Sequence, residues 1–305
     1  MVLCAGRPSR VSEQSNRVSH MLLPVYAGSV NRWECDENDH LNVRFFAHKM
    51  QQTLQYGLIE TGIATQQTVN DICRRVVNQH MRHQAEARIA VPMTGLFGVI
   101  GADAQHLRVI TELRNTATET VLATYVMDVS GDFTANNLEL VACPDYAKPR
   151  GIGPAPFYLA DESAQQLITR GCAVIGRGVI QPDECDAEGF LQMFMYMGRN
   201  SDSMPNLFAR FEGDERGKGV VGGAVLEYRM NRFGHLRQGS RYQLLSGVKS
   251  LSEKLQHFVH VLFDVDTGQM VSGSEALAIS MDLVARKSIA IPEQRRKLMQ
   301  TLLLK

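Results

Sequence analysis

The chain of 305 residues has 44% hydrophobic and 21% charged residues, a composition typical of folded globular proteins. Lys and Arg balance Asp and Glu at 32 each, so no overall charge favours nucleic acid or an anionic membrane surface. The longest uncharged run near the middle, 89–102, is broken by Pro92 and is too short to span a bilayer. We therefore expect no nucleic-acid partner and no membrane insertion.

The N-terminal segment 1–20 is rich in Ser and Arg and lacks an apolar signal core, so it resembles a transit peptide only weakly. We interpret it as a disordered extension. The six cysteines show no C-x-x-C spacing, which favours reduced thiols in a cytoplasmic protein. The scattered histidines and cysteines predict no metal site and suggest no cofactor.

The polar stretch WECDENDH, 33–40, separates an extended apolar segment from a helical one. After it, apolar residues recur at spacings of three and four, which predicts a buried helix: Val43, Phe46, Met50, Leu54 and Leu58. The stretch EARIAV from Glu86 is predicted to open the next strand. Further along, 121–129 alternates with period two, as in an antiparallel strand.

The same order of elements recurs 150 residues later, around a second E-C-D at 184–186. A second helix follows, which Pro205 should end or bend. Strands with period two come next, and a short helix with Pro292 in its first turn ends the chain. Between the copies, 142–157 is rich in proline and glycine and reads as a linker. The predicted domains are therefore 21–141 and 158–305.

Each half thus contains a strand, a polar turn, a long buried helix and an antiparallel meander. A helix that is apolar over most of its circumference can be buried only if a curved sheet wraps it. The sequence therefore predicts an α+β fold of two similar domains.

The residues Asp36, Asn38 and His40 combine a carboxylate, an amide and an imidazole just before a helix start. A helix N-terminus presents free N–H groups that can hold a developing oxyanion, while a carboxylate and an imidazole can move protons. The competing interpretation is helix capping, which explains Asp or Asn at such positions individually. It does not explain the histidine or the recurrence of E-C-D.

At these residues the chain resembles tandem hot-dog proteins of the acyl-CoA thioesterase family. The E-C-D is similar to the D-C-D of 4-hydroxybenzoyl-CoA thioesterases, whose second Asp is catalytic and corresponds to Asp36. Plant acyl-ACP thioesterases carry D-x-N-x-H-V-N-N, which Asp36, Asn38, His40 and Asn42 match. The resemblance implies two tandem hot-dog domains, each a curved antiparallel sheet around a central helix. It also implies that Asn42 and the backbone N–H of Val43 bind the substrate.

Two departures from these families stand out. The plant enzymes have a further catalytic carboxylate on the next strand, where this chain has Ala90 in the best alignment; Glu86 precedes that point. The second copy keeps Asp186 and Glu188 but has Phe190 in place of the histidine. We interpret it as a degenerate second site that supplies pocket walls. Four methionines of this copy either line an acyl pocket or fill a core: Met193, Met195, Met197 and Met204.

The leading hypothesis is hydrolysis of an acyl-CoA to free acid and CoA, a role in lipid metabolism, with Asp36 as nucleophile or general base. Acyl-ACP is a second possible substrate. A hot-dog enoyl-thioester hydratase is an alternative, although its D-x-N-P-L-H motif places the histidine one residue later than His40. A non-catalytic acyl-CoA-binding protein is another, favoured by Ala90 and by the altered second copy. Exposed sheet edges would also permit a homo-oligomer.

Overall fold

One eleven-stranded antiparallel sheet runs through the computed structural model, which describes residues 21–133, 138–212 and 221–305. The strand order is β1-β3-β4-β5-β2-β7-β10-β9-β8-β6, and β11 pairs with β10. The predicted extension 1–20 lies outside the described residues. The strands are β1 (Leu23–Ser29), β2 (Val76–His83), β3 (Pro92–Ala102), β4 (His106–Asn115), β5 (Val121–Ser130), β6 (Ala173–Val179), β7 (Val221–Arg232), β8 (Arg241–Leu251), β9 (Leu255–Asp264), β10 (Met270–Asp282) and β11 (Lys287–Ile289).

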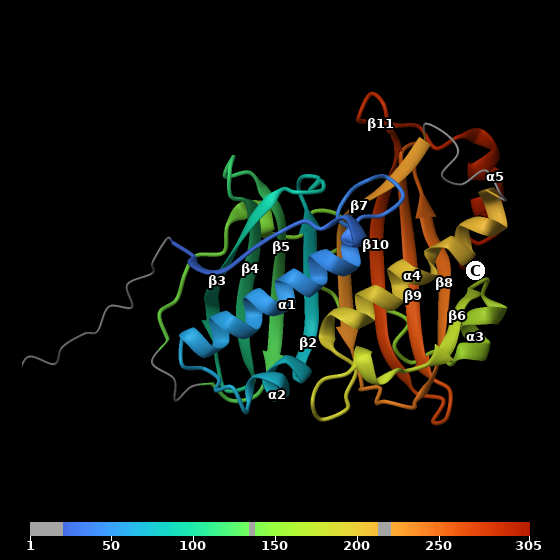
Figure 1. Cartoon of the computed structure of the whole chain (residues 1–305). Coiled ribbons are helices and arrows are strands. Elements are labelled where there is room, and N and C mark those ends of the chain that lie inside the picture. Colours follow the sequence, from blue (N-terminus) through green and yellow to red (C-terminus); the bar gives the residue numbers. More distant parts are fainter. Residues whose placement is uncertain (1–20, 134–137, 213–220) are drawn as a thin grey trace, which may run out of the picture.

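Two long helices lie on the same side of this sheet, side by side (Figure 1). They are antiparallel and overlap along their first halves, because the start of each contacts the middle of the other: Arg44 pairs with Asp202 at 2.6 Å, and Gln51 accepts the Phe194 N–H at 2.9 Å. Each half therefore presents a curved sheet to its own helix, as the sequence predicted. The helices are α1 (Val43–Glu60), α2 (Val69–Arg74), α3 (Ala164–Thr169), α4 (Met193–Glu212) and α5 (Glu293–Gln300), with short 3-10 turns at Arg32–Glu34, Asp145–Ala147 and Pro182–Glu184.

The α1 helix begins at Val43, where the apolar periodicity begins, and its core residues Met50, Leu54 and Leu58 are fully buried. Its apolar side is narrower than its sequence indicates, since Tyr56 is 55% exposed. Lys49 is buried on this helix and pairs with Glu34 at 2.8 Å, which anchors the helix to the chain just before the E-C-D turn.

The two halves join through β2 and β7, which pair in register so that Met81 lies opposite Tyr228. The linker region packs against the outer face of this junction. There the Glu227 carboxylate accepts N–H groups from Arg150, Gly151 and Ile152 at 2.8–3.2 Å. The sheet is thus continuous between the two copies.

One expected detail is wrong, and of the two effects expected at Pro205 the end of the helix does not occur. The α4 helix continues through Pro205 to Glu212. Its residues beyond the proline are held by tertiary contacts, since Leu207 is fully buried and Asn206 donates to the Ile175 carbonyl at 2.6 Å. The stretch from Glu86 is a loop between β2 and β3 rather than a strand, because its backbone bonds to the E-C-D turn: the Leu41 N–H donates to the Ala87 carbonyl at 2.7 Å.

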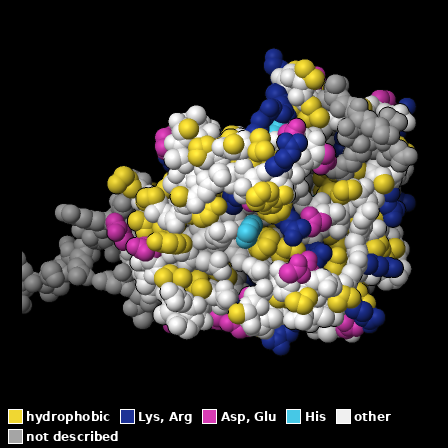
Figure 2. All heavy atoms as spheres, viewed as in Figure 1, with side chains coloured by type: hydrophobic (Ala, Val, Ile, Leu, Met, Phe, Trp, Pro, Cys, Tyr) yellow, Lys and Arg dark blue, Asp and Glu magenta, His cyan; other side chains and the backbone are white. Residues whose placement is uncertain are grey.

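The face that carries the long helices shows acidic and basic side chains interspersed, with apolar ones between them (Figure 2). This distribution agrees with the balanced composition. In the described part of the chain, every helix is too short or too polar to cross a bilayer.

Candidate active site

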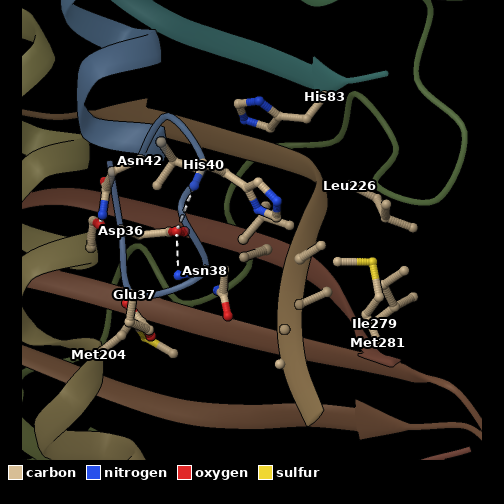
Figure 3. A pocket seen from close by; sticks show the side chains of 18 of the residues that line it. Asp36, Glu37, Asn38, His40, Asn42, His83, Met204, Leu226, Ile279 and Met281 are labelled. Carbon is tan, nitrogen blue, oxygen red and sulfur yellow. Dashed lines mark hydrogen bonds between the residues drawn. The ribbon is translucent and has the colours of Figure 1, made fainter. Parts of the chain in front are cut away.

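The E-C-D turn is closed by its own aspartate. Asp36 Oδ1 accepts the backbone N–H groups of Asn38 at 2.8 Å and His40 at 3.2 Å, as the dashed lines in Figure 3 show. The Asp36 N–H in turn donates to the His40 carbonyl at 2.8 Å, and Asp39 adopts a left-handed conformation with φ 59°. The other oxygen, Asp36 Oδ2, has no hydrogen-bond partner among the described residues.

Asn42 forms the N-cap of α1. Its Oδ1 accepts the Arg44 N–H at 2.8 Å and the Ser201 hydroxyl of α4 at 2.8 Å. The capping interpretation is therefore right for this residue, and its side chain ties α1 to α4. The next N–H, that of Val43, finds no acceptor in the described part of the chain, which leaves this helix-start donor for a ligand.

The His40 imidazole is buried, and its Nε2 lies 3.2 Å from Glu86 Oε2. The other Glu86 oxygen lies 3.5 Å from Nη1 of Arg286, at the end of the C-terminal half. Glu86 therefore places a carboxylate beside His40, where the alignment had pointed to Ala90. Ala90 lies further along the same loop with φ 65°. A search for any carboxylate on the loop, rather than at one aligned position, would have found Glu86.

Asn38 lies on the far side of the turn, against β7 of the other half. A Cβ on Gly222 would lie 2.6 Å from Leu283 Cδ2 and 2.9 Å from Asn38 Oδ1, so a larger residue here would force these side chains to shift. Figure 3 shows Asp36, Asn38 and His40 gathered at one side of the pocket. The structure therefore brings together the three predicted polar residues and adds Glu86.

Burial changes the protonation of both titratable groups of the turn. It raises the pKa of Asp36, with backbone hydrogen bonds from Asn38 and His40 opposing the rise. Burial lowers the pKa of His40, while the nearby Glu86 charge raises it. At neutral pH the imidazole is therefore mostly neutral and can accept a proton.

Cys35 and Cys185 do not fit the role of nucleophile. Burial raises the pKa of both thiols, and Asp36 and Asp186 raise them further. The thiolate, which is the reactive form, is thus disfavoured. Within the described ranges, no group of three or more His, Cys, Asp or Glu side chains is placed to hold a metal ion.

A cavity of about 900 Å³ opens beside the turn. The N-terminal half contributes the turn and the loop after β2; the C-terminal half contributes α4 and the inner faces of β7, β9 and β10. Met197 and Met204 line it, as one interpretation of the methionines expected, whereas Met193 and Met195 are buried elsewhere. Its apolar walls also include Phe46, Phe208, Val225, Leu226, Phe258, Ile279 and Met281.

The second E-C-D turn has the same backbone bonding but no such cavity. Asp186 Oδ1 accepts the N–H groups of Glu188 at 3.1 Å and Phe190 at 2.9 Å. Its other oxygen binds Nη1 of Arg74 at 2.6 Å, and the same atom reaches Glu188 at 2.9 Å. The arginine side chain comes from α2 of the other half and fills the space, leaving only about 10 Å³ beside Asp186.

No protein-family model and no curated protein matches the sequence. Solved structures do match it. A protein assigned as an oleoyl thioesterase from Lactobacillus plantarum superimposes with a TM-score of 0.63 at 11% identity, over 87% of this chain and 99% of the other. The 12:0-ACP thioesterase from Umbellularia californica gives 0.60 at 11% identity, over 84% and 93%. An acyl-ACP thioesterase from Bacteroides thetaiotaomicron gives 0.59 at 8% identity, over 83% and 96%.

The chain has a tandem hot-dog fold. The matches span both halves and nearly the whole of each neighbour, so the duplicated architecture is shared as a unit. Within this tandem hot-dog fold the two copies of the turn have diverged. The N-terminal turn faces an open cavity, and the C-terminal turn is filled by an arginine.

Proposed function

We propose that the chain hydrolyses an acyl thioester of CoA to the free acid and CoA, with acyl-ACP as a second possible donor. The observation that carries this proposal is Asp36 Oδ2, which no described residue pairs and which lies beside a cavity large enough for an acyl chain and a pantetheine arm. The shared fold with proteins described as thioesterases supports the same reaction.

Two routes fit the turn. As a general base, Asp36 takes a proton from water, the water oxygen bonds to the acyl carbon, and the C–S bond breaks. As a nucleophile, Oδ2 bonds to the acyl carbon and expels the thiolate; a water deprotonated by His40 then hydrolyses the anhydride. In both routes the Val43 N–H holds the oxyanion, and a good donor of this kind lowers the barrier by about 2.7–4 kcal/mol.

Glu86 supports turnover rather than binding alone. The non-catalytic interpretation depended on the alanine at position 90, and Glu86 supplies a carboxylate to His40 from a different point of the same loop. Because its charge favours the imidazolium form, Glu86 assists His40 in taking up a proton from water.

The test is release of free thiol from a panel of acyl-CoA and acyl-ACP substrates, comparing Asp36→Asn with Asp186→Asn. The second variant is a matched control, because it changes the same atom of the same turn in the filled copy. We expect Asp36→Asn to lower kcat/KM at least 100-fold, in the range typical of acid–base residues, and Asp186→Asn to stay within about twofold of wild type. No thiol release from any substrate, or full activity in Asp36→Asn, would refute the proposal.

A further inference from the structure

A second group of polar side chains lines the cavity, on the wall that the C-terminal half contributes. Asn200 of α4, Tyr228 of β7 and His260 of β9 all line it and are only 2–5% exposed. They are distinct from the E-C-D turn but close to it, since Ser201 beside Asn200 bonds to the α1 cap at 2.8 Å. An acyl chain attached at the turn would pass over this group.

In the structure, the Asn200 amide directs its nitrogen into a network of hydrogen bonds. Its Nδ2 donates to the Tyr228 hydroxyl and to Ser274 Oγ, the latter at 3.2 Å. Tyr228 donates to Ser274 Oγ at 2.7 Å, and the Ser274 hydroxyl donates to the His260 carbonyl at 3.4 Å. Each donor hydrogen in this chain of bonds has an acceptor, whereas Asn200 Oδ1 receives no donor from the described residues.

A neighbouring bond determines the tautomer of His260. Its Nδ1 lies 2.9 Å from Ser246 Oγ, and Ser246 is fully buried with no other described acceptor for its hydroxyl. The hydroxyl therefore donates to Nδ1, and the ring proton lies on Nε2. Burial lowers the pKa of His260 to about 4, so the ring is neutral at pH 7.

The His260 Nε2–H faces the cavity. It has no partner among the described residues. It also remains accessible to solvent, unlike the fully enclosed side-chain atoms that lack a partner. The wall thus offers one unpaired donor, His260 Nε2–H, and one unpaired acceptor, Asn200 Oδ1. An unsubstituted alkyl chain lying over this wall would displace water from both without replacing its bonds.

From this geometry, and resting on the proposed function, we propose that the preferred thioester carries a hydroxyl group on its acyl part. That hydroxyl accepts a hydrogen bond from His260 Nε2 and donates one to Asn200 Oδ1. An oxo group would satisfy only the histidine. A carboxylate would meet a neutral ring and an amide oxygen, with no charge to balance its own.

The test compares acyl-CoA pairs of equal chain length, with and without a hydroxyl, the hydroxyl being moved along the chain. We expect the full-length protein to favour at least one hydroxylated isomer by about tenfold or more in kcat/KM, because a site built to bind a hydroxyl discriminates against its absence. His260→Phe and Asn200→Leu should bring that ratio close to one. Turnover of the unsubstituted chain should stay the same or rise.

Two further variants control for misfolding. Ser246→Ala removes the bond that determines the tautomer without touching the ligand, and should also reduce the ratio. His257→Gln changes a histidine on the opposite face of β9, which pairs with Glu275 at 2.8 Å outside the cavity, and should preserve it. Equal turnover with and without the hydroxyl at every position, or an unchanged ratio in His260→Phe, would overturn the inference.

Failure of the proposed function has a different signature. If neither acyl-CoA nor acyl-ACP is cleaved, hydrolysis is wrong, and the wall is tested by calorimetric binding of free hydroxy fatty acids against their unsubstituted counterparts. Binding that is at least tenfold tighter for a hydroxylated acid in wild type, and is lost in His260→Phe, supports the hydroxyl site. Equal binding overturns it.

Discussion

Replacing Glu86 by Gln removes one negative charge 3.2 Å from His40 while keeping the side chain's size. The Glu86 charge raises the pKa of His40, so its removal lowers that pKa. Because the Glu86 side chain is 37% exposed, the pair is screened by solvent, and pairs of this kind contribute about 0.2–1 kcal/mol. The pKa of His40 should therefore fall, in keeping with this weak coupling.

The assay is the pH profile of kcat/KM for an acyl-CoA substrate. If His40 acts as a base, activity is lost as pH falls through its pKa, so a lower pKa moves the acid limb to lower pH. The plateau should also fall, by about tenfold, because the imidazole loses its partner. Arg286→Gln is the matched control: that guanidinium lowers the pKa of His40, so its removal should move the limb to higher pH. An acid limb that stays in place or moves upward in Glu86→Gln would show that the pair does not act in catalysis.

Three other substitutions test the packing around the first turn, the filling of the second turn and the junction between the two halves. Gly222→Ala should lower kcat at least tenfold, since its Cβ would lie 2.9 Å from Asn38 Oδ1. Gly223→Ala is the control and should leave kcat unchanged, since the nearest atom to its Cβ would be 3.7 Å away. Equal kcat values in the two variants would refute this prediction. Arg74→Met leaves the part-buried Asp186 without its cation and should lower stability in chemical denaturation, by less than the loss of a fully buried pair. Wild-type stability would mean that the pair contributes nothing. Burial opposes ionisation of Glu227, but hydrogen bonds lower its pKa from 4.5 to about 2, so its contribution of about 3 kcal/mol is present above pH 4.5 and is lost as pH falls toward 2. In Glu227→Gln, this acid-induced loss of stability between pH 5 and 3 should be absent. If the variant's stability depends on pH as the wild type's does, Glu227 is not the group responsible.

The local chemistry of the turn could be predicted because it is encoded by adjacent residues. The side chains of Asp36 and Asn42 act on N–H groups only two to four residues away, and the periodicity after Val43 marks the helix start. Both patterns can be seen in a single sequence. The duplication was visible for the same reason, since E-C-D recurs with the same elements around it.

Glu86 could not be predicted from spacing, because its place depends on tertiary pairing. The backbones of His40 and Arg88 form an isolated bridge, which brings the loop after β2, and Glu86 with it, to the imidazole. The equivalent bridge in the other copy joins Phe190 to Arg237. A one-dimensional alignment instead placed the carboxylate at Ala90, further along the same loop.

That an arginine fills the space beside the second turn also could not be predicted from the sequence. Its cause is a side chain 112 residues earlier in the chain, Arg74, and nothing around Asp186 identifies that partner. The sequence predicted a degenerate copy from its missing histidine. The structure adds that the space itself is occupied, so the second turn has no room for a substrate beside its aspartate.

The cavity draws its reactive turn from one copy and most of its floor from the other. In a dimer of identical single domains, every substitution is made in both active sites and affects turn and floor together. Fusion into one chain ends that constraint. On the proposed function, changes in α4 or β9 would alter which acyl group is accepted while the N-terminal turn is preserved, so selectivity and rate would evolve separately.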